Sequence, residues 1–297
     1  MTVPPNVVAI EIIRAMRPHQ WVKNLFVLTP LVFGGQLTDL AQVILALCAM
    51  VLFSLVSGSV YLLNDVVDRE RDRRHPLKRL RPVAAGRLPV NVAVGALVVG
   101  VAVATLGGWA VTPRLALAIA GYFMLHTAYS FILKHIVFVD LVAIAAGFIL
   151  RILAGAVAVG VPLSPWLVLC TFLLAIFLGM GKRKHELIVS GENGTSLRSV
   201  LARYRLSHLN MALNITSAVT TLAYLLYTTS ERTVAEFGTG HLLFTIPFIV
   251  FGLVRFMQIL ETHRESLSPT EYMLKDIPFL INLVLWALTV VLVIYVF

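Results

Sequence analysis

Residues 41–72, AQVILALCAMVLFSLVSGSVYLLNDVVDRERD, join a long apolar run to a dense cluster of charges. Residues 41–63 contain no charged side chain, and a helix of roughly 20 apolar residues crosses the hydrocarbon core of a bilayer. The run is apolar on every face, whereas a helix on the surface of a soluble protein carries a polar face. We therefore expect a membrane-spanning helix that ends near the charges.

The composition of the whole chain extends this interpretation. Of its 297 residues, 59% are hydrophobic and 13% are charged, about half the charged fraction of a soluble domain. Outer-membrane strands would alternate in polarity, so helices are the spanning structure that such runs allow. We expect an all-α integral membrane bundle, with residues 1–297 forming one domain. Its nine transmembrane helices are expected near residues 18–36, 41–63, 90–111, 113–133, 138–160, 165–180, 209–229, 241–260 and 277–297.

The lysines and arginines indicate an orientation, because positively charged connections stay in the cytoplasm. With the amino terminus inside, 21 of the 24 lysines and arginines fall on the cytoplasmic side and two on the opposite side. We therefore expect a multi-pass protein of the inner (plasma) membrane with its carboxyl terminus on the opposite face. This topology explains part of the net charge of +9. We expect membrane lipids, and no nucleic acid, among the partners. Two long cytoplasmic connections, near 64–89 and 181–208, are expected to form a polar cap that carries the active site.

An aspartate-rich segment opens the first of these connections. If the second helix continues past residue 63, Asn64, Asp68 and Asp72 stack along one helix face with Asp65 beside them. Their carboxylates repel one another, and Mg²⁺, which favours one or two carboxylates plus phosphate oxygens, would relieve that repulsion. We therefore predict that the three aspartates hold Mg²⁺ and are catalytic.

Basic residues follow the acids directly, among them Lys78, Arg79 and Arg81. Guanidinium and ammonium groups suit phosphate oxygens that a metal leaves uncovered, so we expect these three to bind substrate phosphate. A competing interpretation is a juxtamembrane charge belt that fixes topology and binds anionic lipid headgroups. A belt explains the basic residues but not aspartates at helical spacing, so the sequence favours a magnesium-diphosphate site at the membrane surface.

Residues 64–72, NDVVDRERD, resemble the first aspartate-rich motif, N-D-x-x-D-x-x-x-D, of the UbiA superfamily of intramembrane prenyltransferases. The resemblance extends over nearly the whole chain. It implies nine transmembrane helices and a Mg²⁺ ion held on a diphosphate by the asparagine and the three aspartates. Tyr129 and Lys134 are similar to a Tyr-Lys pair of the family, although they are one residue further apart than in its usual Y-x-x-x-K.

The second acidic motif of the family, D-x-x-x-D, is replaced here by GKRKHEL at residues 181–187. One carboxylate, Glu186, remains among several cationic groups. These charges favour substrates that together carry more phosphate groups than a prenyl diphosphate does. This departure, with the segments RPHQWVKN and YLLNDVVDRERDRRHPLKRLRP, resembles one branch of the superfamily, the decaprenyl-phosphate phosphoribosyltransferases. The resemblance implies transfer of 5-phosphoribosyl from 5-phosphoribosyl 1-diphosphate to a polyprenyl (decaprenyl) phosphate. It also implies release of diphosphate and a place in arabinose-donor and cell-envelope synthesis.

Further residues are candidates for contact with these substrates. Glu186 is expected to contact ribose hydroxyls or the metal. Lys182, Arg183 and Lys134 are expected to hold the sugar 5-phosphate or the lipid phosphate. The full set of expected phosphate-binding residues is Lys23, Lys78, Arg79, Arg81, Tyr129, Lys134, Arg151, Lys182 and Arg183.

Two of these residues carry open alternatives. Arg151 lies deep within a span, where an arginine needs an anion, a cavity or another polar group. Its partner is either a substrate phosphate or a structural carboxylate or carbonyl. Lys23 follows Trp21, and such a pair is either an interfacial anchor or, by the family resemblance, a substrate contact.

Two other functions compete with this interpretation. An ordinary UbiA-type prenyltransferase would move an isoprenoid from prenyl diphosphate to an aromatic acceptor, with Glu186 alone in place of the second acidic motif. A carrier for an anionic lipid would show polar residues toward both faces and broken helices around the midplane. The polar residues gather on one side with only Arg151 deep inside, so the sequence favours an enzyme over a transporter.

Overall fold

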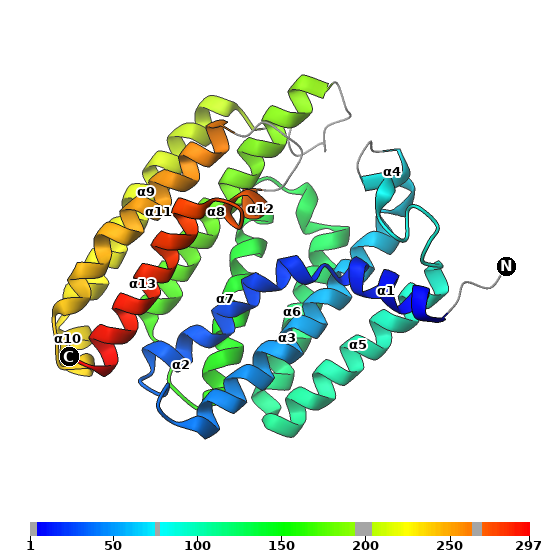
Figure 1. Cartoon of the computed structure of the whole chain (residues 1–297). Coiled ribbons are helices and arrows are strands. Elements are labelled where there is room, and N and C mark those ends of the chain that lie inside the picture. The colour runs from blue at the N-terminus through cyan, green and yellow to red at the C-terminus, as the bar shows by residue number, and fades with distance from the viewer. Residues whose placement is uncertain (1–4, 75–77, 194–203, 263–268) are drawn as a thin grey trace. The chain divides into compact units, whose positions relative to one another are not determined.

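The structure, a computed structural model, describes residues 5–74, 78–193, 204–262 and 269–297. Every regular element within these ranges is a helix (Figure 1). This confirms the all-α class that the long apolar runs predict.

The chain divides into two compact units. Unit 1 comprises Met1–Lys134 and Gly147–Leu163, and unit 2 comprises His135–Ala146 and Ser164–Phe297. Helix α7 (Val139–Val159) therefore contributes its first turns to unit 2 and the rest to unit 1. That residues 1–297 form one domain stays a prediction.

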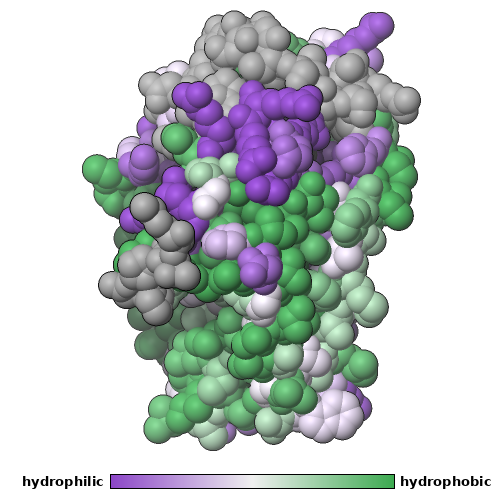
Figure 2. All heavy atoms as spheres, turned by 90° about the vertical axis from the view of Figure 1, so that its right-hand side faces the viewer, coloured by the Kyte–Doolittle hydropathy of each residue, from purple (hydrophilic) through white to green (hydrophobic). Residues whose placement is uncertain are grey.

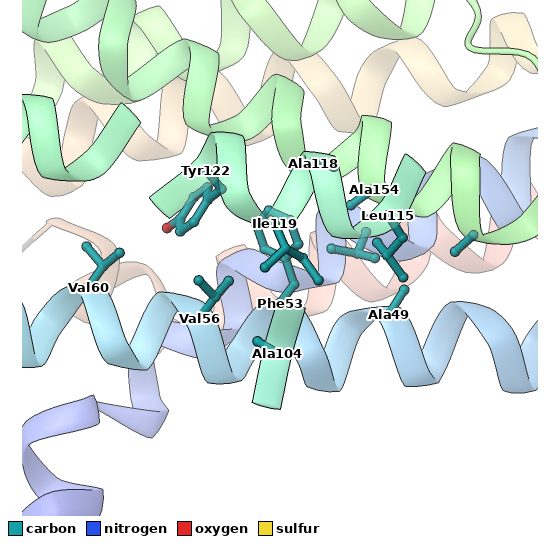
Figure 3. Packing of buried hydrophobic residues seen from close by; sticks show 12 residues of the cluster. Ala49, Phe53, Val56, Val60, Ala104, Leu115, Ala118, Ile119, Tyr122 and Ala154 are labelled. Carbon is teal, nitrogen blue, oxygen red and sulfur yellow. The ribbon is translucent and has the colours of Figure 1, made fainter. Parts of the chain in front are cut away.

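Unit 1 is arranged around one long helix, α3, against which α5 and α6 pack. Its elements, besides its part of α7, are α1 (Pro5–Met16), η1 (Pro18–Leu28), α2 (Thr29–Phe33), α3 (Leu40–Val67), α4 (Arg69–Arg73), η2 (Lys78–Leu80), α5 (Val90–Val111), α6 (Pro113–Phe131) and, at its end, η3 (Leu133–His135). Phe53 and Val56 of α3 point toward Ile119 and Tyr122 of α6 in the core of this unit (Figure 3). The uncharged run 41–63 thus supplies the central helix of the unit.

Small residues let the backbones of unit 1 approach closely. A Cβ atom at Gly155 of α7 would lie 1.9 Å from the carbonyl oxygen of Val27 in η1. A Cβ atom at Gly100 of α5 would lie 2.3 Å from the Oγ of Ser59 in α3. Gly155 requires glycine because the atom it would meet belongs to the backbone, and such small residues are common where membrane helices pack closely.

The turn between α1 and η1 has an unusual backbone. Arg17 adopts φ 54° and ψ 67°, in the left-handed region that residues other than glycine rarely occupy. Nearby on α1, the buried Glu11 accepts hydrogen bonds from Arg14 and Arg87. Burial alone would raise the pKa of the Glu11 carboxyl, but the bonds from Arg87 and Arg14 bring it below its ordinary value. These bonds tie α1 to the segment that precedes α5.

Unit 2 contains the C-terminal helices. Besides its part of α7, its elements are α8 (Pro165–Asn193), α9 (Leu206–Thr229), α10 (Glu231–Phe237), η5 (His241–Thr245), α11 (Ile246–Thr262), α12 (Pro269–Met273) and α13 (Ile277–Tyr295). Phe177 of α8 and Phe256 of α11 lie at its core with ring centroids 5.2 Å apart. A Cβ atom at Gly181 would lie 2.5 Å from the Phe256 ring, so the packing continues along α8 into the segment GKRKHEL.

Seven helices in the described ranges are long and apolar enough to cross a membrane. These stretches are Leu40–Val67, Val90–Val111, Val139–Val159, Pro165–Val189, Leu206–Thr229, His241–Thr262 and Ile277–Tyr295. They coincide with seven of the nine expected spans. The other two expected segments, near 18–36 and 113–133, are helical as η1 with α2 and as α6, but they are not among these seven.

One boundary differs from the expected one. Helix α8 continues to Asn193, so the connection expected near 181–208 begins later than residue 181. The charged part of α8 stays helical because Arg183 and Glu186 pair with each other one turn apart. In the sequence, the apolar run ends at the first charged residues. The helix itself continues through those residues when their charges are paired.

The surface of unit 1 separates polar from apolar side chains. Figure 2 shows hydrophilic residues gathered at one end of this side of the molecule, with mainly hydrophobic residues over the rest. Among the exposed hydrophobic side chains are Leu106 and Trp109 of α5 and Leu117 of α6. Exposed large hydrophobic side chains on this scale suit helices that face lipid.

Candidate functional site

The aspartate motif lies at the junction of α3 and α4. Asp68, with ψ 7°, interrupts the helix between Val67 and Arg69. Helical hydrogen bonds nevertheless continue, since the Asp68 nitrogen lies 2.9 Å from the Asn64 carbonyl oxygen and the Asp72 nitrogen 2.8 Å from that of Asp68. The motif therefore keeps the helical spacing that the sequence predicts.

Asp65 and Asp72 are seven residues apart, about two helical turns, and they share one cation. The Nη1 atom of Arg81 lies 2.5 Å from Oδ2 of Asp72 and 3.4 Å from Oδ1 of Asp65. Arg17 also donates a hydrogen bond to Oδ1 of Asp65. The Asp65 and Asp72 side chains are 1% and 4% exposed, against 21% and 26% for Arg17 and Arg81. The two acids thus lie beneath a partly exposed layer of arginine.

Asp68 and Asn64 face other partners, from the end of α6 and from η3. The Nζ atom of Lys134 lies 2.9 Å and 3.3 Å from the two carboxylate oxygens of Asp68. The hydroxyl of Ser130 donates to Oδ1 of Asn64. The carboxylate repulsion that the sequence predicts is therefore relieved here by cationic side chains from three other segments of unit 1.

The acids fit a Mg²⁺ ion when substrate oxygens complete its coordination. Within the described ranges, no three His, Cys, Asp or Glu side chains gather into a full metal cage. A single cationic nitrogen nevertheless bridges Asp65 and Asp72, and Oδ2 of Asp65 is buried with no hydrogen-bond partner in the part of the chain that is described. Two carboxylates with phosphate oxygens and water match what Mg²⁺ prefers. Of the four expected ligands, Asp65 and Asp72 are thus brought together.

Arg151 is buried in unit 1 among neutral groups. Its guanidinium donates to Oδ1 of Asn24 at 2.8 Å, to the carbonyl oxygen of Gly147 at 2.9 Å and to the hydroxyl of Tyr122 at 2.8 Å. It also lies 4.8 Å from the centroid of the Tyr122 ring. No carboxylate of the described residues forms an ion pair with it. The partners shown here are structural, and contact with a substrate phosphate stays a prediction.

The segment GKRKHEL places its cationic residues on different sides of α8. Arg183 is fully buried, with Nε 2.6 Å from Oδ2 of Asp140 on α7 and with Nη1 donating to Glu186. Tyr204 donates from its hydroxyl to the other Asp140 oxygen at 3.0 Å. Lys182, one residue earlier on the helix, is exposed. Arg183 is thus neutralised by two carboxylates, so the cationic excess that the sequence indicates is smaller in the folded chain.

Tyr204 anchors this cluster from the segment before α9. The backbone nitrogen of Phe138, which has a left-handed φ of 65°, donates to the Tyr204 hydroxyl at 3.2 Å. Burial, together with the neighbouring charge of Asp140, raises the pKa of Tyr204 to about 12. The phenol therefore stays a proton donor to Asp140 over the whole neutral range.

The remaining expected phosphate-binding residues lie in unit 1. The Nζ atom of Lys23, on η1, donates to Oε1 of Gln20 at 2.7 Å. Lys78 and Arg79 lie on η2, where Arg79 is exposed. Tyr129 lies on α6, five residues before Lys134 of η3. Their contacts with substrate stay predictions.

Arg17, Asp140 and Tyr204 are among the residues of these clusters that were not expected from the sequence. Arg17 opens the segment RPHQWVKN, so that resemblance was the signal that would have found it. Asp140 and Tyr204 belong to no motif, and they are 64 residues apart in the chain. Only the folded chain brings them together.

Known proteins resemble this chain over most of its length. Residues 25–275 match the UbiA prenyltransferase family. The chain is 37% identical over 228 residues to the decaprenyl-phosphate phosphoribosyltransferase of Mycobacterium tuberculosis (strain CDC 1551 / Oshkosh), covering 75% of this chain and 76% of that protein. It is 32% identical over 299 residues to the protein of that name from Corynebacterium glutamicum, covering 99% and 89%.

Solved structures bear out the fold. A UbiA homolog from Archaeoglobus fulgidus bound to DMAPP and Mg²⁺ superposes with a TM-score of 0.72 at 19% identity. The superposition covers 97% of this chain and 100% of that chain. With its repeated apolar helices, this chain is a multi-pass membrane protein, and it belongs to the UbiA prenyltransferase family.

Proposed function

We propose that the protein transfers 5-phosphoribosyl from 5-phosphoribosyl 1-diphosphate to a polyprenyl phosphate and releases diphosphate. The observation that carries this proposal is the pair of buried carboxylates, Asp65 and Asp72, bridged by one cationic nitrogen in a chain of the UbiA prenyltransferase family. Relatives at 32% and 37% identity that bear the name decaprenyl-phosphate phosphoribosyltransferase support the choice of substrates. A role in supplying arabinose donors for the cell envelope is part of the same proposal.

Asp65 and Asp72 would hold Mg²⁺ together with oxygens of the diphosphate. Asp68 would keep Lys134 positioned, since both carboxylate oxygens accept from that ammonium group. Lys134 and Arg81 would then donate to phosphate oxygens that the ion leaves uncovered. A bound Mg²⁺ would draw charge from the departing diphosphate.

The segment GKRKHEL would act on the phosphoribosyl end of the donor. Glu186, which pairs with Arg183, has carboxylate oxygens suited to accept hydrogen bonds from ribose hydroxyls. Lys182 is exposed and suits the sugar 5-phosphate. Arg183, held by Asp140, would serve chiefly to orient Glu186.

The proposed reaction breaks the bond between ribose C1 and the diphosphate oxygen and forms a bond from C1 to an oxygen of the lipid phosphate. That oxygen already carries negative charge, so no general base is required. The electron pair of the broken bond leaves on the diphosphate. The chain therefore acts by positioning the reactants and by stabilising charge.

The proposal places this chemistry at the cytoplasmic face of the plasma membrane, with the amino terminus cytoplasmic and the carboxyl terminus opposite. Nine spans give that arrangement, and the two further helices are long enough. The 11 residues of η1 and five of α2 extend roughly 30 Å, and the 19 residues of α6 about 28 Å. Both lengths are close to the hydrocarbon thickness of a bilayer, about 30 Å.

The test is a transfer assay with purified protein, Mg²⁺, polyprenyl phosphate and 5-phosphoribosyl 1-diphosphate labelled in the ribose. Label should appear in the organic phase and diphosphate in the aqueous phase. Chelation of Mg²⁺ or the substitution Asp68→Ala should abolish both. Absence of label from the organic phase with the wild-type protein would refute the proposal.

A prenyltransferase is the second candidate, since a solved UbiA homolog of the same fold is bound to DMAPP and Mg²⁺. A parallel assay with labelled prenyl diphosphate and an aromatic acid separates the two. Prenylated acid without any transfer from the phosphoribosyl donor would favour the second candidate.

A further inference from the structure

Each carboxylate of the aspartate motif is paired with a cation from a different segment of unit 1. Arg17 comes from the turn before η1, Arg81 follows η2, and Lys134 lies in η3. Together they cover the acids where a divalent cation would contact them. A divalent ion and these side chains therefore compete for the same carboxylate oxygens.

Arg17 also has an unusual backbone conformation and a second side-chain contact. It keeps a left-handed backbone that a glycine would adopt without strain, which costs an arginine about 1 kcal/mol or more. Its guanidinium lies 4.9 Å from the centroid of the Tyr61 ring while it donates to Asp65. Both contacts direct the side chain to the acid beneath it, and they give a physical reason for an arginine at this position.

Burial separates the two partners of these pairs. Asp65 and Asp72 are almost fully enclosed, whereas Arg17 and Arg81 keep 21% and 26% of their side chains exposed. An arginine can leave such a position by rotating outward, without repacking the core of α3. Oδ2 of Asp65 is buried and has no hydrogen-bond partner among the described residues, so a cation that replaced the arginines would find one oxygen without a partner.

We propose that Arg17 and Arg81 are exchangeable counter-ions that make binding of the divalent cation depend on the diphosphate. Without the cation they neutralise Asp65 and Asp72. With Mg²⁺ and a diphosphate bound, Asp65 and Asp72 would hold the ion. The guanidinium groups of Arg17 and Arg81 would then donate hydrogen bonds to diphosphate oxygens. This inference rests on the proposed use of a diphosphate substrate, and it adds Arg17 to the residues that bind it.

Charge balance explains the dependence. Two acids with two arginines carry no net charge, and the same holds for two acids with Mg²⁺. Mg²⁺ alone would leave two guanidinium groups without anions beside a doubly charged ion, and like unit charges 4 Å apart repel by about 4 kcal/mol at an effective dielectric constant of 20. The diphosphate offsets this repulsion because its negatively charged oxygens accept hydrogen bonds from both guanidinium groups. Mg²⁺ and diphosphate therefore bind cooperatively, each raising the affinity of the other.

The test is calorimetric titration of purified protein with Mg²⁺ alone and with Mg²⁺ in the presence of inorganic diphosphate. Wild-type protein should bind Mg²⁺ weakly alone and at least about tenfold more tightly with diphosphate. The variant Arg81→Gln should shift the two affinities in opposite directions. It should bind Mg²⁺ alone more tightly, because a competitor is gone, and Mg²⁺ with diphosphate less tightly, because a ligand is gone.

Arg17→Gln should give the same reversal, which keeps the test informative if one variant is poorly folded. Arg71→Gln is the matched control, because Arg71 is exposed on α4 and forms no ion pair with the described residues. It should change neither affinity by more than about twofold. Loss of both affinities in Arg17→Gln and Arg81→Gln, or no change in either, would overturn the proposal.

Calorimetry and the transfer assay together separate this inference from the proposed function. Opposite shifts in calorimetry without ribosyl transfer would retain the exchange and reject the phosphoribosyl donor. Ribosyl transfer without the opposite shifts would retain the donor and reject the exchange.

Discussion

The two units each contain an arginine bound to aspartate, but they bury the arginine to different degrees. In unit 1, Arg81 bridges Asp65 and Asp72 with 26% of its side chain exposed. In unit 2, Arg183 is 1% exposed and pairs with Asp140, which is fully buried. An ion pair that is partly open to solvent can exchange partners, whereas a fully buried pair that is broken leaves an uncompensated charge.

The difference indicates different tasks. The pairs of unit 1 lie at the junction of α3 and α4, where the chain leaves a membrane-spanning helix. The pair of unit 2 joins α7 to α8 and is closed further by the Tyr204 hydroxyl. We infer that the first cluster acts on ligands and that the second fixes the position of Glu186.

The largest expected effect is on activity, from Asp65→Asn. Asparagine keeps the shape of the side chain but removes the charge that would bind Mg²⁺, so the rate of ribosyl transfer should fall about 1,000-fold or more. Transfer of label to the organic phase measures it. Glu70→Gln, an exposed acid in α4 whose side chain is 69% exposed, is the control and should retain nearly full activity. An equal fall in both variants would mean that charge in this segment, and not a specific ligand, matters.

The next effect is on stability, from Asp140→Asn. Removing one partner of a fully buried pair should lower the free energy of unfolding by about 3 kcal/mol. Arg81→Gln, in the more open cluster, should lower it by about 1 kcal/mol. Thermal unfolding in detergent, at one heating rate, ranks the two variants. Addition of Mg²⁺ should raise the midpoint of Arg81→Gln and leave the deficit of Asp140→Asn in place, and the reverse order would contradict the comparison.

The acid cluster of unit 1 is easier to predict from the sequence than the Arg183 cluster of unit 2, because its signals are local. The uncharged run 41–63 and the spacing of the acids from Asn64 to Asp72 lie within one helical segment, so helix geometry alone places them. The pairing of Arg17 with Asp65 spans 48 positions, and it depends on how η1 packs against α3. No periodicity carries that information.

In unit 2 the decisive contacts are all distant. Arg183 and Asp140 are 43 positions apart in the chain. Asp140 stands at the start of an apolar run, where a single acidic residue is interpreted as the end of a membrane span. Charge counting in GKRKHEL predicts a phosphate site with several free cations. The count of charges does not show that Arg183 is buried against two carboxylates while Lys182 is exposed, because burial depends on how α8 is oriented against α7.

A smaller effect on stability is expected at Gly155, and it tests what holds unit 1 together. If the ion pairs of unit 1 are free to exchange, close packing of its helices must supply its stability. The added methyl group in Gly155→Ala would meet the carbonyl oxygen of Val27, so α7 and η1 must separate, which costs about 1–3 kcal/mol. Thermal unfolding measures it, with Gly95→Ala, where a Cβ atom meets nothing within 4 Å, as the control. A loss as large in the control would remove the packing argument.

The smallest expected effect is a pH dependence from Tyr204. Burial and the charge of Asp140 raise its pKa from about 10 to about 12, so the folded state retains a proton that the unfolded state loses. Its contribution to stability should therefore be complete below pH 10 and decline as the pH rises toward 12. The difference in thermal midpoint between wild type and Tyr204→Phe, measured from pH 8 to pH 11, isolates this contribution because the other tyrosines titrate in both proteins. A difference that stays constant across that range would mean that the Tyr204 hydroxyl bears on Asp140 too weakly to belong to the cluster that holds Arg183.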